Sequence, residues 1–171
     1  LSGVISGSGG LTKNGSATLT LSGANTYTGT TTVNAGTLTL NGGSAIVDTG
    51  AVSVGSGAVL NLGASETIGS IAGAGNVTLG SYTLTAGGDD SSTTLSGVIS
   101  GSGALTKNGT GTLTLTGANT HTGATTINAG TLQIGAGSTT GALSSSTAIT
   151  NNGTLEFNRS NAITVSNAIG G

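Results

Sequence analysis

The residues whose types could support chemistry are few, and their spacing does not bring them together. The chain has one histidine, His121, and no cysteine, so a metal site would lack convergent nitrogen and sulfur ligands. Asp89 and Asp90 are adjacent, and neighbouring strand residues point to opposite faces, so they are not expected to form an acid–base pair. Their glycine and serine neighbours indicate a solvated turn, with weak calcium contact as the alternative. The sequence therefore predicts no catalytic residue, no metal ligand and no cofactor.

The remaining ionisable residues are interpreted as structural. His121 stands where an internal repeat has Tyr27, so an exposed or corner-packed ring is expected. Lys13 and Lys107 each precede Asn-Gly and are expected at exposed corners, where they would aid solubility and discourage pairing at sheet edges. With three cations and a net charge of -2, the chain has no electrostatic means of binding nucleic acid. No apolar run approaches the roughly 18 residues of a membrane-spanning segment.

A long internal repeat organises the chain. Residues 1–40 and 95–134 are identical at 31 of 40 positions without a gap, and a third copy begins at residues 165–171. Most differences exchange similar residues, such as Val33 for Ile127, which is what a conserved interior requires. We therefore treat residues 1–171 as a single repetitive segment and not as several domains.

Alternating apolar and polar residues predict short strands throughout. The clearest runs are at residues 17–21, 36–40, 51–54, 59–62, 77–79 and 154–157, each closed by Gly, Asn or Ser. No stretch shows a convincing helical spacing. A sandwich normally fills the space between its sheets with several large aromatic residues, and this chain has only two Tyr and one Phe. Its Leu, Val, Ile and Ala residues suit a narrow solenoid interior. The sequence thus predicts an all-β parallel β-helix (β-solenoid).

The dimensions and corners of this solenoid also follow from the sequence. About 20 residues per coil would give roughly eight coils. The recurring residues Asn25, Asn34, Asn119 and Asn128 are predicted to form hydrogen-bonded ladders at turns, with Gly15 and Gly109 at corners that need a positive φ. Neither end shows a polar capping segment, so the solenoid is expected to be uncapped at both ends, cut from a longer array or stacked head to tail with copies of itself.

The run GALTKNGTGTLTLTGANTHTGATTINAGTL, residues 103–132, resembles the passenger-associated repeat of bacterial autotransporters. Residues 9–38 carry the same pattern with Ala17 in place of one glycine, and His121 stands where the family usually has Tyr. The resemblance implies a right-handed parallel β-helix in the passenger of a type V secreted protein. Such passengers are released or displayed on the cell surface, held to the outer membrane through a part outside these residues, and the repeat is associated with their export and folding.

These features are compatible with two functions. The first is a structural stem or fibre-forming segment that aids export and displays other domains. Its partners would be adjacent segments of the same longer chain or head-to-tail copies. The alternative is an adhesive module whose flat Thr/Asn/Ser face contacts a surface glycan, a host ligand or sister chains. A binding face should interrupt the repeat, and only residues 143–146 and 157–159 do so, mildly. Enzyme activity is not expected, and Thr-x-Thr steps leave ice binding as a further alternative.

Overall fold

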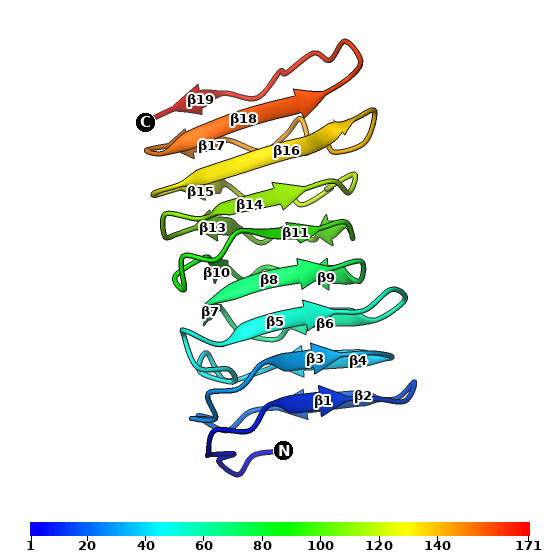
Figure 1. The fold of residues 1–171 in the computed structure, drawn as a ribbon, viewed down its shortest axis with the longest axis vertical. Helices are drawn as coiled ribbons and strands as arrows, with labels where there is room; N and C mark the ends of the chain where they lie inside the picture. Colours follow the sequence, from blue (N-terminus) through cyan, green and yellow to red (C-terminus); the bar gives the residue numbers. More distant parts are fainter.

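The computed structural model describes residues 1–171 and contains strands but no helix. Every pair of neighbouring strands runs parallel, and the strands stack into one rod (Figure 1). The predicted all-β parallel solenoid is therefore confirmed, and antiparallel hairpins and a sandwich are excluded. No segment forms a helix of the length and apolar character needed to cross a membrane.

Three sheets form the sides of the rod, and each is a stack of strands from successive coils. Sheet A has eight strands: β1 (Leu11–Lys13), β3 (Thr31–Val33), β5 (Ala51–Val54), β8 (Ser70–Gly73), β11 (Thr93–Leu95), β14 (Thr112–Leu115), β16 (Thr131–Ser138) and β18 (Thr154–Arg159). Sheet B has five strands: β2 (Thr18–Leu21), β4 (Thr37–Leu40), β6 (Val59–Leu62), β9 (Asn76–Thr78) and β12 (Ile99–Ser100). Sheet C has six strands: β7 (Glu66–Ile68), β10 (Leu84–Ala86), β13 (Leu105–Lys107), β15 (Thr125–Ile127), β17 (Ile149–Asn151) and β19 (Ile169–Gly170).

From β5 to β14 the chain passes through sheets A, B and C in turn as it climbs. Earlier coils supply strands to sheets A and B alone, and later coils supply strands to sheets C and A alone. Each coil contributes one strand to sheet A, so the eight strands of this sheet give about eight coils, as the sequence predicts. In Figure 1 the strands of sheet A face the viewer and run from left to right while the chain climbs from the N-terminus at the bottom to the C-terminus at the top. This path makes the coil right-handed.

The alternating runs of the sequence form strands whose apolar side chains fill a single interior. In β4 and β6, for example, every second residue is buried. Parallel register then places like residues above one another, as in the column Leu38, Leu60 and Val77 of sheet B. The interior is one cluster of 26 buried apolar residues that extends from Leu21 to Ile149. Burying each Leu or Val contributes about 1.5–3 kcal/mol, so the stack of coils is the main source of stability.

The two copies of the repeat face different directions. The Leu-Thr-Lys strand is β1 of sheet A in the first copy and β13 of sheet C in the second. Likewise, the Thr-Leu-Thr-Leu strand is β2 of sheet B in the first copy and β14 of sheet A in the second. The offset between copies is thus not a whole number of coils. Any surface feature encoded by the repeat is presented on two sides of the rod.

Candidate functional site

The two lysines are buried, which corrects the sequence-based expectation of exposed corners. Lys13 is 6% exposed and Lys107 is 1% exposed. Each occupies an inward-facing column: Lys13 pairs with Val33 in sheet A, and Lys107 lies between Ala86 and Ile127 in sheet C. The alternation of Leu-Thr-Lys does place the lysine on the same face as the leucine, so the signal was present in the sequence.

Each buried ammonium is held by three backbone carbonyl groups, an arrangement that we call the lysine clamp. Lys13 Nζ donates to the carbonyl oxygens of Asn14 (3.0 Å), Gly15 (2.7 Å) and Ala35 (3.0 Å). Lys107 Nζ donates likewise to Asn108 (2.5 Å), Gly109 (2.9 Å) and Ala129 (3.5 Å). The last acceptor in each set belongs to the next coil, so the clamp ties two coils together. Gly15 and Gly109 have φ of 77° and 69°, which turns the chain at this corner.

Two of the predicted asparagines connect three successive coils. Asn25 Oδ1 accepts from the Ile5 N–H (2.8 Å) and its Nδ2 donates to the Ala45 carbonyl (2.7 Å). Asn119 repeats this arrangement in the second copy, accepting from the Ile99 N–H (2.9 Å) and donating to the Ala142 carbonyl (2.9 Å). Both side chains are buried and satisfied, so they replace backbone hydrogen bonds where a coil turns.

The other two predicted asparagines form exposed steps at the corners beside the lysine clamps. Asn34 Nδ2 donates to Asn14 Oδ1 over 2.8 Å, and Asn128 Nδ2 donates to Asn108 Oδ1 over the same distance. Each pair joins two neighbouring coils by a single side-chain hydrogen bond. Their place outside the interior makes them lesser contributors to stability than Asn25 and Asn119.

Tyr27 and His121 occupy equivalent interior positions, so the exposed alternative for His121 is wrong and the packed alternative is right. The Tyr27 hydroxyl lies 2.6 Å from Thr31 Oγ1, and His121 Nε2 lies 2.9 Å from Thr125 Oγ1. Both threonines are fully buried. Burial lowers the pKa of His121 and raises the pKa of Tyr27. The His121 Nδ1 atom is buried without a hydrogen-bond partner.

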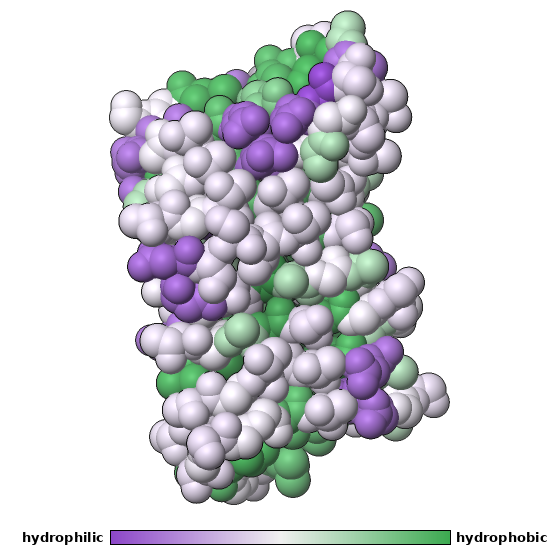
Figure 2. Space-filling model, in the orientation of Figure 1, coloured by the Kyte–Doolittle hydropathy of each residue, from purple (hydrophilic) through white to green (hydrophobic).

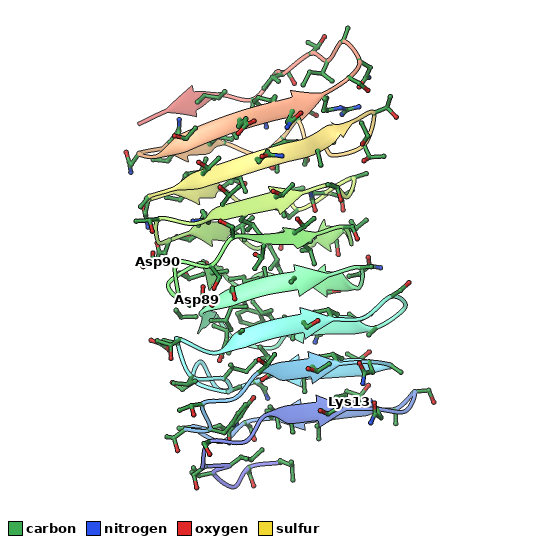
Figure 3. All side chains as sticks on the ribbon, in the orientation of Figure 1. Lys13, Asp89 and Asp90 are labelled. Carbon is green, nitrogen blue, oxygen red and sulfur yellow. The ribbon has the colours of Figure 1, made fainter.

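Asp89 and Asp90 form the predicted turn, between β10 and β11, and do not converge on a common point. Asp89 Oδ2 accepts from Ser70 Oγ over 2.6 Å, whereas Asp90 Oδ1 accepts from the Thr110 N–H over 2.7 Å. The hydrogen bonds that the Thr110 N–H and the Thr110 hydroxyl donate to Asp90 lower the pKa of this carboxyl, and the Lys107 ammonium lowers it further. Figure 3 shows both aspartates in a loop at the left edge of the rod, on the opposite edge from Lys13. They stabilise a corner and offer no pair for acid–base chemistry.

Glu66 is a buried carboxylate that sequence reasoning missed. It begins β7, faces the interior and is 3% exposed. Its Oε1 accepts from the Ile46 N–H over 2.7 Å, while its Oε2 has no partner. Burial raises the pKa of this carboxyl, the Ile46 hydrogen bond offsets part of the rise, and the Asp48 carboxylate adds to it. The alternation of Glu-Thr-Ile would have placed Glu66 on the face of Ile68.

We expect a Glu66→Gln variant to lose one component of the pH dependence of stability. Because the folded-state pKa is raised, the folded chain binds the proton more tightly than the unfolded chain, so stability falls as pH rises through that pKa. At pH 7.5 the neutral amide should be more stable than the wild type by about 1–2 kcal/mol. At pH 5 the difference should shrink. Urea unfolding of both proteins at the two pH values measures it, and a difference that does not change with pH would contradict the assignment.

The one cleft of the structure lies in the last coils and contains the only Phe and the only Arg of the chain. Its volume is about 60 Å³. The Arg159 guanidinium donates to the backbone carbonyl groups of Gly141 (2.6 Å) and Thr139 and, through Nε, to Asn161 Oδ1 (3.2 Å), so each of its three nitrogen atoms already has a partner. Phe157 is half-buried, and a register shift between β16 and β18 accompanies it. The apolar lining residues are Ile134, Ala142, Leu143, Phe157, Ile163 and Val165.

The outer surface of the rod carries little charge. Lys13, Lys107 and Glu66 lie in the interior, which leaves Asp48, Asp89, Asp90, Glu156 and Arg159 as the charged side chains toward solvent. Figure 2 shows the face of sheet A as mostly pale, with a few separate hydrophilic groups. No three His, Cys, Asp or Glu side chains are grouped so that they could hold a metal ion. The polar chemistry of this molecule is therefore concentrated inside the coils, where it fixes their corners.

Stacked parallel coils, a shared apolar interior and repeated polar clamps define a β-solenoid repeat protein. Two segments, residues 11–44 and 105–134, match the profile of the passenger-associated-transport-repeat family. A stretch of 89 residues is 66% identical to part of the adhesin BmaC autotransporter of Brucella suis biovar 1 (strain 1330). This stretch covers 52% of the chain but 3% of that relative. No solved structure matches the chain. The resemblance to the autotransporter passenger repeat is thus confirmed, and each copy of the internal repeat carries one matched segment.

Proposed function

We propose that this chain is a stiff stem segment of a secreted or surface-displayed bacterial passenger, where it holds other parts of the protein at a fixed distance. The observation that carries the proposal is the single interior that runs without a break from Leu21 to Ile149 and couples each of these coils to its neighbours. The lysine clamps and the buried asparagines add hydrogen bonds between coils at the corners. The partners of such a stem are adjacent segments of the same longer chain, or copies of it placed head to tail.

If the segment is a stiff stem, the distance between its two ends should have a single narrow distribution. The chain has no cysteine, so two introduced cysteines at Ser8 and Ser166, both exposed, can be spin-labelled without side reactions. Eight coils at about 4.8 Å per strand spacing give a label separation of roughly 40 Å. Double electron–electron resonance should show a single narrow distribution near this value. A broad distribution, or one with several maxima, would contradict a stiff stem.

The same stacking supports a role in export. Each coil contacts only its neighbours, so the fold can grow one coil at a time from a folded end. Folding outside the cell would then oppose backward movement of the chain. A Leu60→Asp change places a charge in the middle of the interior and should slow passenger export in the intact protein. Export at the wild-type rate would count against this part of the proposal.

Adhesion is the second candidate function. Two observations favour it: the cleft contains Leu143, Phe157 and Arg159 from the two segments that interrupt the repeat, and the matched relative is named an adhesin. Binding of the purified chain to immobilised glycans and extracellular host proteins tests it. Ile163→Glu, in the cleft, and Val4→Glu, in the first coil, are matched changes at exposed apolar residues. Saturable binding that is lost only in Ile163→Glu supports adhesion, and absence of binding supports a stem alone.

A further inference from the structure

The second copy of the repeat differs from the first at one interior ring, and this difference has a chemical consequence. His121 is 0% exposed and replaces the tyrosine that the first copy has at the equivalent position. Tyr27 presents one hydroxyl, which Thr31 satisfies. The imidazole presents two nitrogen atoms, of which Thr125 satisfies Nε2 and nothing satisfies Nδ1.

The neutral ring fits this site, and the protonated ring does not. In the neutral ring with its proton on Nε2, the N–H donates to Thr125 Oγ1, and Nδ1 carries no proton that needs an acceptor. An imidazolium has two donors, so its Nδ1–H would be buried without an acceptor. The charge itself would also lie in an apolar interior. Proton binding at His121 is therefore opposed by both hydrogen bonding and desolvation.

No carboxylate lies close enough to compensate. The elements packed on the His121 segment are β12 in the coil below, β15 beside it, and residues 142–148 in the coil above, where Thr147 Oγ1 donates to the His121 carbonyl over 2.9 Å. None of these elements contains Asp, Glu, Lys or Arg. Strand β13, which pairs with β15, carries Lys107, whose ammonium is held by the carbonyl groups of Gly109 and Ala129 and supplies no negative charge.

We propose that His121 makes the coils of the second repeat copy acid-sensitive, so that mild acid opens the chain locally around β15 while the equivalent coil around Tyr27 stays closed. The sign follows from linkage. Burial holds the folded-state pKa of His121 below its usual value of 6.5, so the open state binds more protons and is favoured as pH falls below about 6.5. Glu66, which lies near Tyr27, responds in the opposite direction. Its protonation in acid removes a buried negative charge and so favours the folded state. The acid response of His121 would be a regulatory property of the solenoid, separate from its proposed role as a stem.

Hydrogen exchange with mass spectrometry tests the proposal on the full chain without a histidine tag. The readout is the protection factor, corrected for intrinsic exchange, of residues 115–130 and of residues 21–36, between pH 7.5 and pH 5. Protection around His121 should fall by about tenfold per pH unit below 6.5, because each unit of pH changes the ratio of open to closed states tenfold until the folded-state pKa is reached. Protection around Tyr27 should not fall.

The chain supplies its own control variant. His121→Tyr restores the residue of the first copy, keeps a hydroxyl near Thr125 and removes the titrating group. Its protection around β15 should be independent of pH over the same range. Equal acid sensitivity in wild type and His121→Tyr would overturn the proposal, as would equal protection of the two segments at every pH in the wild type.

A second measurement decides the question if the variant does not fold. His121 is the only histidine, so its ring protons give a single set of resonances. In the folded wild type these resonances should remain at neutral-imidazole shifts below pH 6.5. A folded-state titration midpoint at or above 6.5 would show that the ring charges freely and would overturn the proposal.

Discussion

Replacing Lys107 by glutamate will prevent the coils around β13 from forming. The substitution places a carboxylate against the carbonyl oxygens of Asn108, Gly109 and Ala129, where the ammonium now donates three hydrogen bonds. A carboxylate has no proton to donate, and at 1% exposure it cannot be hydrated. Removing one partner of a buried charged network costs about 3–5 kcal/mol, and reversing its sign adds repulsion. Far-UV circular dichroism with thermal melting should show partial or complete loss of the sheet.

Thr106→Glu is the matched control, because it adds a carboxylate one residue away on the same strand. Thr106 faces outward between Thr85 and Thr126, where the new side chain reaches solvent. Its effect should stay within about 0.5 kcal/mol, as for most surface substitutions. The loss of stability in Lys107→Met should lie between the losses in these two variants. Methionine keeps the apolar part of the side chain but leaves the three carbonyl groups without their donor. Equal melting temperatures for Lys107→Glu and Thr106→Glu would mean that the Lys107 ammonium is solvated in the wild type.

The lysine clamp shows where sequence reasoning about this fold succeeds and where it does not. Alternation and the long repeat predict the strands and their stacking because interior Leu, Val and Ile repeat with period 2 in every coil. The same alternation assigns Lys107 to the interior, but the general rarity of buried lysines argues for the surface. The conflict is resolved by the Asn-Gly corner, whose carbonyl groups point inward and receive the ammonium. That orientation depends on backbone geometry, which residue types alone do not specify.

The relative orientation of the two copies could not be predicted either. Neighbouring coils differ in length: Leu11 pairs with Thr31, 20 residues later, whereas Gly73 pairs with Leu95, 22 residues later. Such small differences accumulate over the 94 residues between copies and decide which sheet the second copy enters. The partners of Asn25 and Asn119 depend on the same register, so the sequence names these residues as candidates without identifying what they bind. For function, the consequence is that repeat-encoded features do not form one continuous stripe.

Gly97→Ala tests the close approach of coils on which this stacking depends. A Cβ atom at Gly97 would lie 1.8 Å from the Gly75 carbonyl oxygen in the coil below, and one at Gly117 would lie 2.1 Å from the Gly97 carbonyl oxygen. The three glycines form a column that has no room for a methyl group, so alanine must push backbone away from backbone. We expect a loss of about 3 kcal/mol in the free energy of unfolding, the upper range for overpacking.

The control for this change is Gly88→Ala, at a glycine whose Cβ would meet no atom within 4 Å and whose φ is not in the left-handed region. It should be neutral or stabilising by up to about 1 kcal/mol, because alanine restricts the unfolded chain. Urea unfolding of the two variants separates steric contact between coils from the general effect of replacing glycine. Similar midpoints for Gly97→Ala and Gly88→Ala would show that the coils can separate without penalty, and a solenoid of that kind could not serve as a stiff stem.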